Sequence, residues 1–131
     1  MKIRGTDFIL FPVRDIPRAV AFYRDILHLP MGICSAEHGW AEFDAGNVTL
    51  ALQASKSTET AGGETRLALA VDNVDAAHTE LTEIGLTVPE RIEDHGVCRV
   101  FEIRDPDGNR ILLHHRQDGT YGQTPLPHPL P

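Results

Sequence analysis

The chain carries one pattern twice, and this internal repeat limits the possible folds more than any other feature of the sequence. Residues 8–16 and residues 66–74 each combine an apolar strand with the start of a helix. Asp15 and Asn73 stand at the two helix starts. Both residue types are good helix caps, because their side-chain oxygens accept hydrogen bonds from the unpaired N–H groups of a first turn. The sequence therefore predicts two similar modules.

Each repeat continues with a helix and then with short strands separated by turn signals. Apolar residues at helical spacing predict a first helix that Pro30 stops, and a second helix over about residues 74–84 that Gly85 ends. Each half then reads β-α-β-β-β, so we predict an α+β domain of two paired βαβββ modules. The strands predicted after the helices cover residues 31–36, 39–43, 48–53, 90–93, 97–104 and 110–115.

Composition shifts divide the chain into four parts. The first module spans residues 1–54 and the second spans residues 65–116, and a polar, Gly-rich linker over residues 55–64 joins them. Residues 117–131 form a Pro-rich tail, which cannot become a regular helix because proline lacks a backbone donor. We expect one domain overall.

Charge and cysteine content exclude several classes of function. The 19 acidic residues outnumber the 12 Lys and Arg residues, which gives a formal net charge of −7. Such a surface repels nucleic acids and anionic membranes, and on this criterion a cationic ligand is favoured. Two cysteines are too few for a disulfide scaffold, and no apolar run approaches the roughly 20 residues of a membrane span. The N-terminal residues do not resemble a signal peptide, so we expect a cytoplasmic protein.

Three segments resemble the vicinal oxygen chelate superfamily, which includes glyoxalase I, extradiol dioxygenases, fosfomycin-modifying enzymes and bleomycin-resistance proteins. They are Val-Arg-Asp with Ala-Phe-Tyr-Arg-Asp-Ile-Leu in residues 13–27, Asp-Ala-Gly-Asn with Leu-Ala-Leu in residues 44–52, and Asp-Pro-Asp-Gly-Asn-Arg-Ile in residues 105–111. The resemblance covers about residues 5–116. It implies paired modules whose sheets curl into a cup-shaped cavity, within a homodimer.

Four positions hold a divalent ion in the metal-dependent members of this superfamily. By the resemblance, these positions carry Phe8, Ala51, Arg66 and Leu112 in this chain. Phe, Ala and Leu have no donor atom for a metal, and Arg is a permanent cation that repels one. We therefore expect that the family metal site is lost and that the protein has no cofactor.

The resemblance implies that the four family positions face the cup, and strand alternation then places residues two apart from them on the same side. The register implied by the resemblance adds Glu102 to this side. The resulting wall is apolar with a few polar groups, as small-molecule sites commonly are. The candidate ligand-binding residues are Phe8, Trp40, Thr49, Gln53, Arg66, Glu102, Arg110, Leu112 and His114.

Several of these residues have more than one interpretation. Arg66 either holds an oxyanion of a ligand or forms a structural ion pair, with Glu102 as a partner, that fills the old metal site. Glu102 is a general base if burial raises its pKa, and otherwise a salt-bridge partner or a ligand contact. Trp40 either stacks with Phe8 on a flat aromatic ligand or packs in the core or dimer interface. His114 touches a ligand at the rim or is exposed.

The sequence favours a metal-independent protein that binds and sequesters a small aromatic or cationic compound, as a homodimer. The alternative is an enzyme: a glyoxalase-like lyase or isomerase, or a dioxygenase, acting on a small oxygenated substrate. Such an enzyme would use Glu102 and Arg66, or an unusual metal site that includes Asp7, Glu102 and His114. A third interpretation is an interaction domain whose Pro-rich tail recruits another protein.

Overall fold

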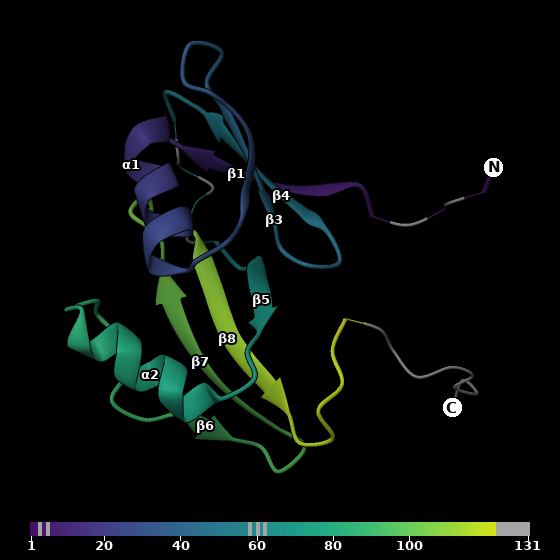
Figure 1. The fold of residues 1–131 in the computed structure, drawn as a ribbon, viewed down its shortest axis with the longest axis vertical. Coiled ribbons are helices and arrows are strands. Elements are labelled where there is room, and N and C mark those ends of the chain that lie inside the picture. Colours follow the sequence, from purple (N-terminus) through teal and green to yellow (C-terminus); the bar gives the residue numbers. More distant parts are fainter. Residues whose placement is uncertain (3, 5, 58, 60, 62, 123–131) are drawn as a thin grey trace.

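Each repeat of the sequence forms its own sheet (Figure 1). The structure, a computed structural model, describes residues 1–122 except residues 3, 5, 58, 60 and 62. Sheet A has the strand order β1-β4-β3-β2, and sheet B has the order β5-β8-β7-β6. In each sheet the first strand of the module runs parallel to the last, and the other neighbours are antiparallel. The prediction of two βαβββ modules is confirmed.

The helices and strands have the following bounds. Sheet A contains β1 (Phe8–Val13), β2 (Met31–Ser35), β3 (Trp40–Asp44) and β4 (Thr49–Ala54). Sheet B contains β5 (Arg66–Ala70), β6 (Glu93–Asp94), β7 (Cys98–Arg104) and β8 (Arg110–Arg116). The helices are α1 (Ile16–Val20), which continues into η1 (Ala21–Ile26), and α2 (Val74–Glu83). No helix among the described residues is long and apolar enough to cross a membrane.

The strand predicted near residues 90–93 needs correction, and parts of the predicted linker and tail lie outside the residues that the structure describes. This strand forms instead at Glu93–Asp94. Only these two residues pair with β7, because they lie next to the turn in which the His95 N–H donates to the Cys98 carbonyl. The tail lies outside the described residues from residue 123 onward, as do residues 58, 60 and 62 of the linker.

The first helix also differs from the single regular helix that the sequence predicts. Its cap is as predicted, since Asp15 Oδ1 accepts a hydrogen bond from the Arg18 N–H at 3.1 Å. Its second half, η1, is a π-helix, and the Leu27 N–H then bonds the carbonyl five residues back, at Phe22, at 3.1 Å. The two adjacent aromatic residues of this wider turn, Phe22 and Tyr23, are both buried.

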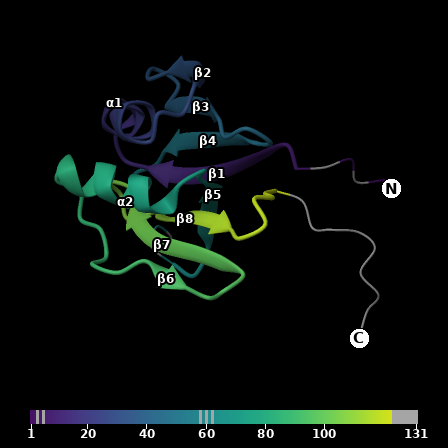
Figure 2. The same ribbon diagram turned by 60° about the horizontal axis from the view of Figure 1, so that its bottom comes forward.

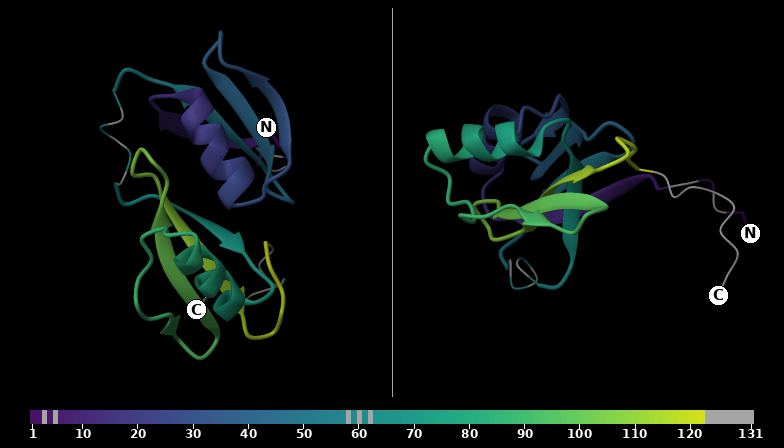
Figure 3. Two further views of the ribbon diagram at one scale, coloured as in Figure 1. Left: turned by 60° about the vertical axis from the view of Figure 1, so that its left-hand side comes forward. Right: turned by 90° about the horizontal axis from the view of Figure 1, so that it is seen from below.

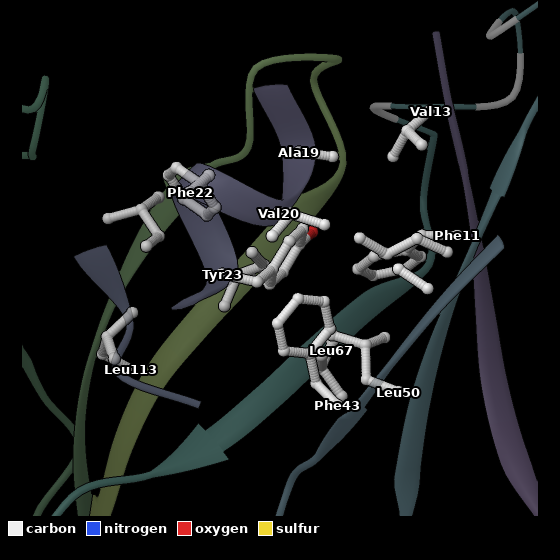
Figure 4. Packing of buried hydrophobic residues seen from close by; sticks show 14 of the residues in the cluster. Phe11, Val13, Ala19, Val20, Phe22, Tyr23, Phe43, Leu50, Leu67 and Leu113 are labelled. Carbon is white, nitrogen blue, oxygen red and sulfur yellow. The ribbon is translucent and has the colours of Figure 1, made fainter. Parts of the chain in front are cut away.

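The inner faces of both sheets contribute to one hydrophobic core. Phe43 and Leu50 of sheet A, Leu67 and Leu113 of sheet B, and Tyr23 of η1 belong to the same buried cluster (Figure 4). Sheet A and the strands β7 and β8 lie in separate layers (Figure 2), and both helices lie along one side of the molecule (Figure 3). Because side chains alternate across a strand, the other face of each sheet is turned outward.

A buried polar network joins the two modules inside this core. The Tyr23 hydroxyl donates a hydrogen bond to Asp105 Oδ2 at 2.7 Å, and Asn109 Nδ2 donates to the same oxygen at 2.7 Å. Asn109 Nδ2 also donates to the Pro12 carbonyl at 2.9 Å. Burial, together with the Asp105 carboxylate, raises the pKa of Tyr23 far above its ordinary value, so the hydroxyl stays protonated and remains a donor. The chain turns at residues 105–109, where Gly108 has a φ of 91° and its N–H donates to the Asp105 carbonyl at 3.0 Å.

Replacing Tyr23 with Phe is expected to destabilise the fold by about 1–3 kcal/mol, because it removes one donor from a buried carboxylate. The measurement is the free energy of unfolding from urea titration. Tyr121→Phe is the matched control, since Tyr121 is exposed and its hydroxyl makes no hydrogen bond among the described residues. Equal stability of the two variants would show that the Asp105 contact does not hold the modules together.

Candidate ligand-binding site

The outer face of sheet A presents an aromatic surface, which we call the aromatic face: Phe8, Leu10 and Trp40. The rings of Phe8 and Trp40 meet edge to face, with centroids 6.2 Å apart. They come from β1 and β3, and Ala51 on the intervening strand β4 is fully buried. Phe8 and Leu10 are nevertheless 50% and 42% exposed, so the other described residues leave this face uncovered. Thr49 and Gln53 share it by strand alternation.

The outer face of sheet B carries a cavity of about 360 Å³ that is rich in arginine. Arg66 and Arg110 donate from Nε to one oxygen of Glu102, at 2.9 and 3.0 Å. Arg104 Nη2 lies 4.0 Å from the other carboxylate oxygen. We call this cavity the arginine cavity. Its lining consists of Arg66, Pro89, Arg91, Glu93, Val100, Phe101, Glu102, Arg110 and Leu112.

The arginines determine the charge state of Glu102. Burial of this carboxyl group disfavours its charged form, but the hydrogen bonds from Arg66 and Arg110 outweigh burial. The pKa of Glu102 is therefore lowered from its ordinary value of 4.5. A general base near neutral pH needs a raised pKa, and the environment of Glu102 has the opposite effect. The ion pair between Arg66 and Glu102, one of the two interpretations from the sequence, is present.

The residues at the four family metal positions do not fit a metal ion. Phe8 and Ala51 lie on the outer face of sheet A, and Arg66 and Leu112 lie on the outer face of sheet B. Three of these side chains have no donor atom, and the fourth is a cation. Within the described part of the chain, no group of three or more His, Cys, Asp and Glu residues could hold a metal.

A single chain does not bring the candidate residues together. No residue of sheet A lines the arginine cavity. His114 lies at the far end of β8 and lines a different cavity of about 600 Å³, which follows the free edge of β5 and includes the turn at residues 45–48. The candidates thus divide into an aromatic half on sheet A and a charged half on sheet B.

Three residues in or beside these sites were not predicted from the sequence. Arg104 follows Glu102 by two positions on β7, so strand alternation could have identified it. Ile33, on the edge strand β2, is 68% exposed, and a bulge in its pairing with β3 obscured its face. Arg91 comes from an irregular segment before β6, where no periodic pattern exists to find it.

The sequence model of the Glyoxalase/Bleomycin resistance protein/Dioxygenase superfamily matches residues 5–113. The chain belongs to this superfamily. Among curated proteins of known sequence, it is 28% identical over 116 residues to the uncharacterized protein YraH of Bacillus subtilis (strain 168). That match covers 78% of this chain and 91% of YraH.

Solved structures of the superfamily have the same fold. TnmS3, an antibiotic binding protein from Streptomyces sp. CB03234, is 27% identical with a TM-score of 0.75, and the match covers 89% of this chain and 99% of TnmS3. A lactoylglutathione lyase from Agrobacterium tumefaciens is 22% identical with a TM-score of 0.70, covering 87% of this chain and 95% of the lyase. At that lower identity the likeness shows the fold alone.

The lowered pKa of Glu102 predicts how its contribution to stability depends on pH. A carboxyl group with a lower pKa in the folded state than in the unfolded state stabilises the fold above the unfolded value near 4.5, and this contribution is lost as pH falls through the folded pKa. The difference in unfolding free energy between the wild type and Glu102→Gln should therefore shrink as pH falls from about 7 to about 3.

Glu37→Gln serves as the control for this pH series, since Glu37 is exposed and makes no ion pair among the described residues. Urea titrations at each pH provide the free energies. A difference for Glu102→Gln that stays constant over the whole range would contradict the stabilisation of its carboxylate by Arg66 and Arg110.

Proposed function

We propose that this member of the superfamily is a metal-independent binding protein that sequesters a small aromatic compound, in a cup formed between two copies of the chain. One observation carries the proposal. The four positions that hold the ion in metal-dependent relatives carry side chains that cannot ligate it, and they lie on the outer faces of two chemically distinct sheets. Such faces suit a ligand held by ring contacts and hydrogen bonds.

A second copy of the chain is needed because the two half-sites point away from each other. The inner faces of both sheets are used in the common core, so one chain cannot close its aromatic face over its own arginine cavity. In a homodimer, the aromatic face of one protomer can lie opposite the arginine cavity of its partner. The resulting cup would enclose the ligand between a ring-bearing wall and a charged wall.

Charge and edge geometry also support pairing between copies. Glu42 and Asp44 share the outer face of sheet A with Trp40, whereas Arg66, Arg104 and Arg110 occupy the outer face of sheet B. The two faces are therefore complementary in charge. β1 and β5 also have no neighbour on one side within the described residues, and free strand edges are common sites of association.

Binding is better supported than catalysis. TnmS3 is an antibiotic binding protein of the same fold, which is consistent with a binding role here. A lyase, isomerase or dioxygenase of this superfamily would require a metal at positions that lack donors, or a general base in place of the low-pKa carboxylate of Glu102. The cationic ligand favoured by the net charge of the whole chain finds no support in the arginine cavity.

The protein is expected to be a dimer whose cups combine residues of both chains. Trp40→Ala removes the aromatic half and Arg66→Ala removes the charged half, so each variant alone should bind the fluorescent probe 1-anilinonaphthalene-8-sulfonate weakly. After subunits of the two variants are exchanged, about a quarter of the cups contain both intact halves and probe binding returns to that extent. Sedimentation and probe fluorescence provide the two measurements.

A control for nonspecific probe binding is Ile84→Ala, since Ile84 is an exposed apolar residue of the α2 end and not of either outer face. It should leave the probe signal unchanged. A monomer in sedimentation, or mixed variants that stay as weak as each parent, would contradict the shared cup.

Protein purified without chelator should contain no stoichiometric divalent metal, because the four family positions lack donors. Elemental analysis measures this directly, and EDTA should leave the unfolding free energy unchanged. One bound metal per chain would overturn the proposal and favour the enzymatic alternative.

A further inference from the structure

We infer that the bound compound carries a carboxylate, and that this group sits in the arginine cavity against Arg66 and Arg91. The inference rests on the proposed function and specifies its ligand. It starts from the local charge, which is opposite in sign to the net charge of −7. Three arginines, Arg66, Arg104 and Arg110, lie within 4.0 Å of the single carboxylate of Glu102.

One carboxylate cannot neutralise this cluster. The cavity also holds Arg91, which has no ion-pair or hydrogen-bond partner among the described residues. The second acidic residue that lines the cavity, Glu93, interacts with His95, and its Oε2 lies 3.2 Å from His95 Nε2. The region therefore keeps a surplus of positive charge, and a ligand anion is the group that would neutralise it.

The hydrogen bonds of Arg66 leave room for a ligand. Nε donates to Glu102 and Nη1 donates to the Glu64 carbonyl at 3.4 Å, and neither bond uses Nη2. The Arg66 side chain is 38% exposed and lines the cavity. A guanidinium group of this kind matches the planar geometry of a carboxylate.

Arg110 has a different role, which is to position the cluster. It donates from Nε to Glu102 and from Nη1 to the Gly63 carbonyl, both at 3.0 Å, and its side chain is only 15% exposed. Held in this way, Arg110 fixes the Glu102 carboxylate, which in turn fixes Arg66. The site is thus formed before the ligand arrives, which reduces the entropy lost on binding.

The cavity wall separates the charged end of the ligand from its apolar body. Val100, Phe101 and Leu112 line the same cavity as the arginines. These apolar side chains lower the local dielectric and strengthen a charge-assisted hydrogen bond. A planar compound with its carboxylate at Arg66 and its rings toward the partner's aromatic face would use both halves of the cup.

Three probes that share one ring system test the inference: 2-naphthoate, 2-naphthamide and 2-naphthylmethylammonium, titrated by calorimetry into the full-length dimer. We expect 2-naphthoate to bind at least about tenfold more tightly than 2-naphthamide, and the ammonium compound to bind most weakly. Raising the salt concentration should weaken only the binding of naphthoate.

Variants identify the arginines involved. Arg66→Gln and Arg91→Gln should each weaken naphthoate about tenfold and leave naphthamide unchanged. Arg91 has no partner to lose, so its variant keeps the test valid if Arg66→Gln impairs folding. Arg99→Gln is the matched control: it removes an arginine of β7 that pairs with Asp75 at 2.7 Å and does not line the cavity.

The outcomes separate the two proposals. Equal affinity for naphthoate and naphthamide, or tighter binding of the ammonium compound, would overturn the carboxylate inference and leave the binding function intact. If none of the three probes binds, both the inference and the aromatic binding function are overturned.

Discussion

The architecture depends on a carboxylate that the fold has buried between its two modules. Asp105 is 4% exposed, and it accepts hydrogen bonds from the Tyr23 hydroxyl, the Asn109 side chain and the backbone of its own turn. A charge removed from water must find such donors, because an unpaired one costs several kcal/mol (on the order of 3–5). Here one donor comes from the other module. The neighbouring Asp107 makes a second contact between the modules, because its Oδ1 accepts a hydrogen bond from Arg18 Nη2 at 3.0 Å.

These contacts determine which sheet faces stay open for the proposed ligand. Holding η1 against the turn of the second module places Phe22 and Tyr23 between the sheets and uses both inner faces in one core. The outer faces are then left open on a single chain. The shared cup proposed for the dimer is thus a consequence of packing inside the protomer, and it does not require any distortion of either sheet.

Local features of the fold could be predicted from the sequence because they depend on neighbouring residues. Asp15 and Asn73 cap their helices as their side chains predict, with Asn73 Oδ1 accepting from the Ala76 N–H at 3.0 Å. The π-turn of η1 could not be predicted, since it reflects the burial of two adjacent aromatic residues against distant strands. The Tyr23–Asp105 contact joins residues 82 apart, and no local pattern pairs them.

In the candidate site, too, only the features that depend on neighbouring residues could be predicted. Strand alternation placed Arg66 and Arg110 on one face, and the resemblance added Glu102. In the structure both arginines donate to the same carboxylate oxygen of Glu102. Alternation says nothing about how two sheets are oriented to one another, so the separation of Phe8 from Arg66 emerged only from the structure. Arg91 lies in an irregular segment and had no sequence signal.

The proposed anionic ligand is opposite in charge to the cationic ligand that the net charge of the whole chain favours, and this difference has a physical reason. Exposed charges are screened over a Debye length of about 8 Å at physiological salt, so the acidic residues distributed over the surface act weakly at the cavity. Groups that line the cavity act at hydrogen-bond distance and are partly shielded from water, where their interactions are stronger. The sign of the charge near Glu102, and not the sign of the sum, therefore determines which ligands the cavity favours. An acidic protein can in this way maintain a site for an anion.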